Sequence, residues 1–355
     1  MDRKTPARRG RRLLLLALLA LVALGAGHTL LWRAMANQLE DGWQSWVNLR
    51  RAQGWQVEHA PPVRGGWPFA ATLTLDRLRL DGATATLPGG LGFTAQRAVL
   101  RIELPWLDEL HVDLPGHQRL RLGALDYPFI ADRLTATVPL ERDTPPASAE
   151  FIAERLRIGT PSGAMEVALA SLAVSGSSSA TDTESALELS LAAEGVDLPP
   201  AVPGDPLARF GRRIATVSAD LALSGPLPGG RAPTPRAEAW RDSGGTLELR
   251  GLAMRWGSLG GTAKATLALD DALQPMGAGT LRLTGAADAL DALAEAGLVG
   301  RRAALTARGL LPLISRPSAG NGAPEIEVPV MLEDRTLTLA RIPVLRFQPL
   351  AWPGR

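Results

Sequence analysis

From Trp55 onward, apolar and polar residues alternate along the chain with a period of two. In AATLTLDRLRLDG (70–82), leucines alternate with threonines in the first half and with charged residues in the second half. The phase changes at Asp76-Arg77, as it does where a β-bulge adds one residue to a strand. The pattern therefore predicts a strand over this segment with a bulge near its middle.

The same alternation returns in further segments: DELHVDL (108–114), QRLRLG (118–123), TLELRGL (246–252), ATLALD (265–270), TLRLTG (280–285), EIEVPVML (325–332) and RTLTLA (335–340). Strands with one apolar and one polar face are typical of antiparallel sheets that are wet on one side. Gly, Pro and Asp separate nearly every pair, and such short connections form hairpins. The predicted fold class is mainly β, with one large curved antiparallel sheet or two β-rich halves.

Two adjacent segments near the C-terminus have helical spacing instead. TGAADALDALAEAGLV (284–299) places Leu290, Leu293 and Leu298 on or near one face, and GRRAALTARGLLPLI (300–314) follows directly. We expect a helical hairpin at 286–313, inserted between strands. A shorter helix is expected at 236–242.

Residues 225–235 (GPLPGGRAPTP) are rich in proline and glycine. They are a candidate linker between an N-terminal β-rich half, 55–224, and a C-terminal β-rich half, 236–355. One continuous sheet could equally carry them as an insertion. Further loops are expected at 141–148, 175–185 and 315–324.

The N-terminal stretch LLLLALLALVALGAGHTLLW (13–32) has no formal charge over twenty residues. At about 1.5 Å per residue it can cross a hydrocarbon core of about 30 Å. Six cations precede it in a basic tail, 1–12, and Arg33 is the only cation among the next fifteen residues. The positive-inside rule then keeps the N-terminus in the cytoplasm and exports the rest of the chain.

A cleaved signal peptide is the alternative, because Ala34-Met35-Ala36 offers a small-x-small site. We favour an uncleaved anchor, since the apolar run is long and Trp32 and Arg33 separate it from that site. After the anchor, residues 33–54 are expected to continue as a juxtamembrane helix.

Trp43 and Trp46 lie three residues apart in this helix and so share a face. They could sit at the lipid headgroups or pack under the following domain. Packing is favoured, because the helix carries Glu40 and Asp41 and lacks the cationic face of surface-bound helices.

Composition narrows the function classes. Aromatic residues make up only 5%, so the core must be built mainly from Leu, Val and Ala. The net charge is +2, but residues 1–12 carry +5, so residues 13–355 carry −3 and no nucleic-acid partner is expected. The chain has no cysteine, which excludes disulfides and thiolate metal sites.

Two aromatic-Pro-Phe motifs stand out, Trp67-Pro68-Phe69 and Tyr127-Pro128-Phe129. Proline fixes its own φ and holds the preceding residue extended, so both motifs are predicted to be stiff entries to strands. Because most large aromatic side chains are buried, we expect Trp67 and Phe69 to anchor a sheet in the core. The alternative is an aromatic wall of a ligand groove, for which Trp67, Phe69, Tyr127 and Phe129 are the candidate residues.

Candidate chemistry is sparse. His111, Asp113 and His117 could approach one another across a hairpin and bind a metal, but solvated strand positions are the favoured interpretation. The chain has neither a Gly-x-Ser-x-Gly elbow nor a Walker pattern. We therefore predict no catalytic residue, no metal site and no cofactor, and we do not expect an enzyme.

GWPFAATLTLDRLRL (66–80) and the segment 247–299 resemble an uncharacterised bacterial family, common in alphaproteobacteria and known as a domain of unknown function. Its members typically combine an N-terminal membrane helix, a Gly-aromatic-Pro-Phe strand entry, a Trp-Gly turn as at 256–257, a helical hairpin and an IPVL-like end as at 342–345. The resemblance spans about residues 40–350. The chain is also remotely similar to AsmA-like envelope proteins, whose curved sheets form lipid-holding grooves.

The resemblance implies a β-rich protein that is exported and anchored in the inner membrane of a bacterium, with its bulk in the periplasm. It implies no activity. We expect a non-enzymatic protein that binds or transfers a lipid or another hydrophobic molecule in a β-groove. The alternative is a structural protein of the cell envelope that binds a protein partner.

Overall fold

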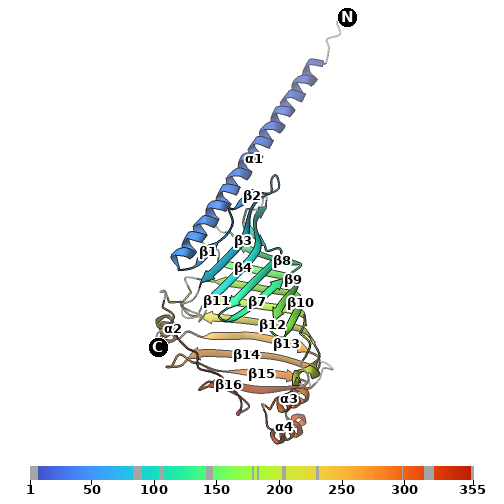
Figure 1. Cartoon of the computed structure of the whole chain (residues 1–355), viewed down its shortest axis with the longest axis vertical. Helices are drawn as coiled ribbons and strands as arrows, with labels where there is room; N and C mark the ends of the chain where they lie inside the picture. Colours follow the sequence, from blue (N-terminus) through green and yellow to red (C-terminus); the bar gives the residue numbers. More distant parts are fainter. Residues whose placement is uncertain are drawn as a thin grey trace.

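The computed structural model describes residues 7–82, 90–103, 107–140, 147–177, 180–181, 184–201, 205–228, 232–297, 299–315 and 324–352. In these residues a long N-terminal helix is followed by one antiparallel sheet with short helices at its margins (Figure 1). The helices are α1 (Ala7–Ala52), η1 (Pro206–Phe210, a 3-10 helix), α2 (Pro233–Asp242), α3 (Ala286–Glu295) and α4 (Arg301–Ile314).

The first nine strands are β1 (Gln56–Glu58), β2 (Val63–Gly65), β3 (Ala70–Gly82), β4 (Leu91–Glu103), β5 (Glu109–Asp113), β6 (His117–Leu122), β7 (Leu125–Ile130), β8 (Arg133–Pro139) and β9 (Ser148–Thr160). The remaining strands are β10 (Gly163–Gly176), β11 (Ser185–Asp197), β12 (Arg213–Ser224), β13 (Leu247–Trp256), β14 (Leu259–Leu269), β15 (Pro275–Thr284), β16 (Glu325–Glu333), β17 (Thr336–Leu339) and β18 (Ile342–Arg346). The prediction of a mainly β fold is confirmed.

The strands follow one another in a long meander. β3 pairs with β1 and β2 along one edge and with β4 along the other. β4 then pairs with β5 and β6, β5 with β8, and β6 with β7, before β7 and β8 both pair with β9. From β9 to β18 every strand pairs with the next. The sheet is not interrupted at the candidate linker, because β12 and β13, the strands before and after it, pair directly.

The phase change in β3 is confirmed, but the one-residue bulge is wrong. Asp76 pairs with Arg97 and Leu78 with Ala95, so the register is the same on both sides of this point, and each strand skips one residue, Arg77 on β3 and Gln96 on β4. Arg77 has a φ of 56°. This kink in both strands returns the leucines of the two halves of β3 to one face, which explains the phase change in the sequence.

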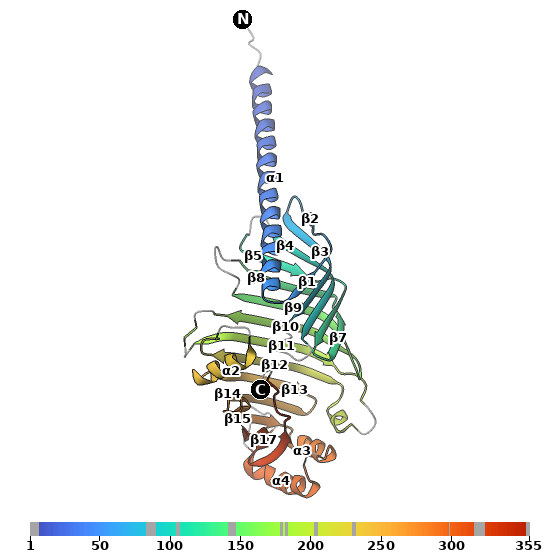
Figure 2. The same cartoon turned by 60° about the vertical axis from the view of Figure 1, so that its left-hand side comes forward.

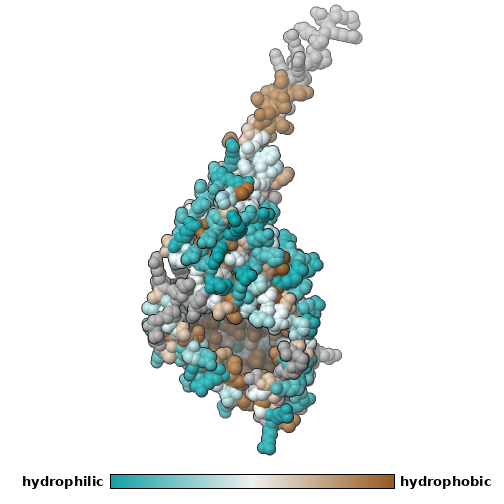
Figure 3. Space-filling model, in the orientation of Figure 1, coloured by the Kyte–Doolittle hydropathy of each residue, from teal (hydrophilic) through white to brown (hydrophobic). Residues whose placement is uncertain are grey.

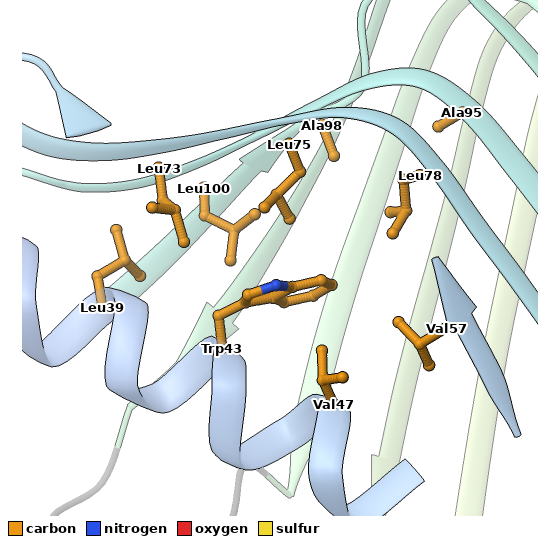
Figure 4. Packing of buried hydrophobic residues seen from close by; sticks show 10 residues of the cluster. All are labelled: Leu39, Trp43, Val47, Val57, Leu73, Leu75, Leu78, Ala95, Ala98 and Leu100. Carbon is orange, nitrogen blue, oxygen red and sulfur yellow. The ribbon is translucent and has the colours of Figure 1, made fainter. Parts of the chain in front are cut away.

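The anchor segment and the juxtamembrane segment form one continuous helix, α1. Its second half lies on β3 and β4, where Leu39, Trp43 and Val47 point toward the sheet (Figure 4). These residues recur every four positions and so form one stripe of the helix. Packing of Trp43 under the domain is confirmed, since it is buried and stacks on Trp46 at 5.1 Å between ring centroids.

The shorter helices lie along the margins of the sheet. α3 and α4 form the expected helical hairpin between β15 and β16, at the end of the molecule far from α1 (Figure 2). α2, which lies between β12 and β13 in the chain, includes the short helix predicted at 236–242. Several predicted features lie partly or wholly outside the described residues: the basic tail at 1–12, the segments 141–148, 175–185, 225–235 and 315–324, and Leu298.

Candidate functional site: the apolar face of the sheet

One face of the sheet carries an apolar row that crosses twelve strands. Residues directly opposite one another on antiparallel strands share a face, so the register of each pair extends the row. We call it the central row. It consists of Leu73, Leu100, Val112, Ala136, Phe151, Leu172, Leu191, Ala219, Leu252, Ala263, Leu281 and Val328.

Two further apolar rows flank the central row on the same face. The α2-side row consists of Ala149, Val174, Leu189, Leu221, Leu249, Ala265, Gly279, Val330 and Leu339. The η1-side row consists of Leu156, Val167, Val196, Ile214, Trp256 and Leu259. The face is therefore several side chains wide as well as twelve strands long.

Aligned kinks keep the η1-side row on this face. Each of the four strands β9–β12 skips one residue at this level without a change of register between them: Arg155, Ala168, Gly195 and Ala215. Arg155 and Gly195 have φ of 46° and 60°. Kinks at neighbouring positions of successive strands introduce curvature into a sheet. This explains how long strands form a curved surface with one continuous apolar side.

The opposite face is polar. Its residues alternate with those of the central row, as in Ser171, Ala192, Ser218, Ala253, Thr262, Arg282 and Glu327. Arg282 and Glu327 form an ion pair at 3.2 Å, and Arg250 pairs with Glu188 at 2.7 Å. The charged side chains of this face give it a surface suited to water.

The central row differs in exposure along its length. Under α1 its members are buried, with Leu73 at 0% and Leu100 at 7% exposed. Farther along, Leu191 and Leu252 are 41% and 36% exposed. Figure 3 shows a hollow lined by apolar residues at the level of β12–β14. We call β3–β5 the covered part of the face and β9–β16 the open part.

The open part is long compared with a lipid. Eight strands at about 4.8 Å spacing give about 34 Å along the row. The hydrocarbon of one membrane leaflet is about 15 Å thick, half of the bilayer value. The face is therefore long enough for an extended acyl chain.

Both rims of the open part are fixed by specific contacts. At one rim, Arg209 of η1 forms an ion pair with Glu295 of α3, and the ring centroids of Phe210 and Trp256 lie 5.4 Å apart. At the other rim, the Trp240 indole N–H donates to the Ser224 carbonyl at 2.9 Å. Trp352 likewise donates to the Leu273 carbonyl at 2.8 Å. These contacts fix the rims without closing the face.

The two aromatic-Pro-Phe motifs lie in different places. Tyr127 and Phe129 are half-buried in β7, within the strand instead of at its entry. Tyr127 pairs with Leu120, whose partner Phe93 packs against the core under α1, so the Tyr127 ring is on the apolar face. Of the four aromatic candidates, this pair is the one that adjoins the apolar face.

The prediction that Trp67 and Phe69 anchor the core is wrong. They lie in the turn between β2 and β3 and are 60% and 81% exposed. The physical reason is that α1 already fills the core there. Met35 and Ala36 of the helix pack against buried Ala71, with Trp32 beside them, which leaves no space for the two rings.

The histidine candidates do not gather into a metal site. In the part of the chain that the structure describes, no three His, Cys, Asp or Glu side chains come together. Asp113 forms an ion pair with Arg101, and the imidazole Nδ1 of His111 lies 3.4 Å from the Thr137 hydroxyl. His111 and Asp113 therefore make separate contacts and do not form a shared site with His117.

A carboxylate on the polar face links β3 to β6 across the intervening strand β4. Hydrogen bonds from the guanidinium groups of Arg79 and Arg121 lower the pKa of Asp81 below its ordinary value. In the open part, a hydrogen bond from Arg250 lowers the pKa of Glu188 in the same way. Both are strand-linking ion pairs on the wet side of the sheet.

A family comparison covers nearly the whole folded region. Residues 32–348 match the model of a family described as uncharacterised protein conserved in bacteria (DUF2125). The chain belongs to this family. The DUF2125 match begins at Trp32 and so includes the second half of α1 together with the sheet up to β18. It does not test the more remote similarity to AsmA-like proteins, and neither curated proteins nor solved structures gave a match.

This DUF2125 member also has one described helix that is long and apolar enough to cross a membrane, starting at Leu13. Its most apolar window has a mean hydropathy of 2.3 and no residue buried in the body. Such a helix fits a single-pass membrane protein, and a signal sequence near the N-terminus has the same features.

Sequence reasoning missed the three apolar rows as a site. Alternating leucines indicated strands with one apolar face, but which residues meet across strands depends on register. The aliphatic character of the alternating positions was the available signal, because a closed two-layer core usually contains more large aromatic residues.

Proposed function

We propose that this protein is anchored in the bacterial inner membrane and holds its sheet in the periplasm. Residues 13–32 would form the anchor, with the N-terminus in the cytoplasm. We further propose that the open part of the apolar face binds the acyl chain of a lipid or a similarly elongated hydrophobic molecule. The function is binding or transfer without catalysis.

One observation carries the proposal: an unbroken apolar row is buried under a helix at one end and is half-buried or exposed from β9 to β16. Exposed aliphatic surface of this extent is unfavourable in water, and an apolar ligand would remove it from solvent. The open part offers hydrocarbon contacts along about 34 Å, at about 4.8 Å per strand, and so fits a long chain more closely than a compact molecule.

The position of the helix supports an uncleaved anchor. Cleavage after Ala36 would remove Trp32, Met35 and Ala36, which pack on Ala71 at the start of β3. It would also remove the hydrogen bond from the Trp32 indole to the Ala70 carbonyl at 2.8 Å. The end of the proposed anchor and the residues after it are thus packed on the sheet, and an uncleaved anchor would hold the covered end of the apolar face toward the membrane that would supply a lipid.

Position-specific photocrosslinking in the full-length protein tests lipid binding. A photoreactive phenylalanine analogue replaces Leu191 on the central row or, as a control, Leu169 on the neighbouring strand. Both leucines are 41% exposed, but Leu169 pairs with Glu154 and Glu194 on the polar face. After irradiation of native membranes, mass spectrometry of the protein identifies any adduct.

We expect a phospholipid or fatty-acyl adduct at position 191 and none at position 169. Lipids that surround the membrane helix do not interfere, because the crosslinker is placed far along the sheet. Equal lipid labelling of both positions, or labelling of neither, would contradict the proposal. A protein adduct at position 191 would instead favour the structural role with an envelope partner.

A further inference from the structure

The turn between β2 and β3 exposes two aromatic side chains beside the membrane helix. Phe69 is 81% exposed and Trp67 is 60% exposed, in a chain with only 5% aromatic residues. The hairpin of β2 and β3 reaches farther along α1 toward the N-terminus than the other labelled strands (Figures 1 and 2). These rings therefore lie at the end of the sheet that is nearest to the anchor.

Specific contacts attach this hairpin to α1. The His28 imidazole Nε2 lies 2.6 Å from the Pro68 carbonyl oxygen, and because a carbonyl only accepts, this nitrogen carries the proton. The Trp32 indole N–H donates to the Ala70 carbonyl at 2.8 Å. On β2, the Arg64 guanidinium bonds Glu40 and Asn37 of the helix. The turn is thus held at a fixed height along α1.

That height coincides with the end of the apolar segment. His28 and Trp32 are within the last five of the twenty uncharged residues, and Arg33 is the first charged residue after them. Five residues of helix span about 6 Å between the first and the last. The turn therefore lies where the hydrocarbon core gives way to the headgroup region, if residues 13–32 span the bilayer as proposed above.

The backbone of the turn is suited to an apolar environment. The Gly66 carbonyl accepts from the Ala70 N–H at 3.0 Å, and the Pro68 and Ala70 carbonyls are bonded to the helix. Pro68 has no N–H of its own. Removing these groups from water costs little, because each already has a partner.

We propose that the turn Trp67-Pro68-Phe69 inserts into the lipid–water interface of the outer leaflet of the membrane that holds α1. This inference rests on the membrane anchoring proposed above and adds a second membrane contact. Trp and Phe are favoured at this depth, where a ring can contact hydrocarbon beside headgroups. A protein held by a single membrane helix is free to rotate and tilt relative to the bilayer. A second membrane contact fixes the orientation of its apolar face.

Lipid quenching of a fluorophore on single cysteines tests the insertion, since the chain has no native cysteine. Full-length Phe69→Cys, Leu24→Cys and Leu305→Cys proteins are labelled with an environment-sensitive dye and reconstituted in phosphatidylethanolamine–phosphatidylglycerol vesicles. Some of the lipids carry a nitroxide near the headgroup. Leu24 lies in the anchor and Leu305 is exposed on α4 at the far end, so they serve as the positive and negative controls.

We expect the nitroxide to reduce fluorescence at position 69 several-fold more than at position 305. A nitroxide deep in the acyl chain should quench position 24 more strongly than position 69. Trp67→Cys repeats the measurement on the same turn, in case labelling at position 69 disturbs the protein. Both residues are exposed, so neither substitution removes core packing.

The controls separate the two proposals. Quenching at position 24, with positions 67 and 69 as weakly quenched as position 305, would overturn the inserted turn and leave the anchor intact. An absence of quenching at position 24 would overturn the anchor and the turn together. Equal quenching at all positions would also overturn the inserted turn, because lipid contact would then not be specific to it.

Discussion

The covered and open parts of the apolar face are built from the same kind of residue but have different neighbours. Leu73 and Leu191 occupy equivalent positions in the central row, yet Leu73 is fully buried and Leu191 is 41% exposed. The difference comes from α1, which packs Leu39, Trp43 and Val47 onto β3 and β4. Pleated strands with one apolar side need a second layer, and here a helix provides it at one end only.

The end of α1 limits the covered part of the sheet. α1 ends at Ala52, Gly54 follows with φ of 90°, and the chain returns as β1 to pair with β3. A glycine at positive φ is a common helix stop because it has no side chain to clash. The position of this stop limits how much of the sheet α1 can protect.

The largest effect should come from truncating the same leucine in the two parts. Leu73→Ala removes a fully buried side chain and should lower the free energy of unfolding by about 3 kcal/mol. Leu191→Ala removes a side chain already in partial contact with water and should cost about 1 kcal/mol. Urea midpoints of the full-length variants, followed by tryptophan fluorescence, measure both. Equal losses would show that the open part is covered by something else in solution.

A smaller effect is expected where a tryptophan lies on a glycine in the covered part. A Cβ at Gly82 would lie 2.3 Å from the Trp55 ring, so Gly82→Ala must displace the indole and should cost about 1–3 kcal/mol.

Gly251 in the open part is the matched control for this substitution. A Cβ there would meet the Asp220 carboxylate at an ordinary 3.4 Å. Gly251→Ala should therefore lose no stability and gain up to about 1 kcal/mol, because alanine is less flexible in the unfolded chain. A loss at Gly251 as large as that at Gly82 would contradict the difference in packing between the two parts. Thermal melts of both variants test it.

The smallest effect on stability is expected from removing the carboxylates that link strands, Asp81 in the covered part and Glu188 in the open part. Because the pKa of Asp81 is lowered in the folded protein, its ion pairs stabilise the fold above about pH 3.8 and are lost as the pH falls below that value. Asp81→Asn should cost about 1 kcal/mol at neutral pH and should flatten the stability profile in acid.

Glu188 of the open part serves as the comparison for Asp81. Its side chain is 47% exposed, against 18% for Asp81, so solvent screens its pair with Arg250. Glu188→Gln should change stability by less than about 0.5 kcal/mol. Unfolding curves at neutral and at acidic pH measure both variants. A larger loss for Glu188→Gln would indicate that the open part is held by ion pairs more than the covered part is.

Much of the local structure could be predicted from the sequence. The alternation in 70–82, with its phase change at Asp76-Arg77, located a strand and the kink in it. The helical spacing in 284–314 located α3 and α4. These signals are local, since they depend on the geometry of one strand or one helix.

The location of the aromatic residues could not be predicted in the same way. Trp67 and Trp43 have similar chemistry, but Trp43 is buried on β3 and Trp67 is exposed in a turn. Whether a ring is buried depends on what else fills the space, and at the start of β3 that space belongs to Met35 and Ala36 of α1. A residue's own neighbours in the chain do not contain that information.

The sequence by itself determined a long apolar segment, one-sided strands and the class of fold, because charge, length and period act within each segment. The tertiary structure alone decided that twelve strands align their apolar residues in one row and that α1 covers only the first of them. Register and packing are long-range properties, fixed by contacts between residues far apart in the chain.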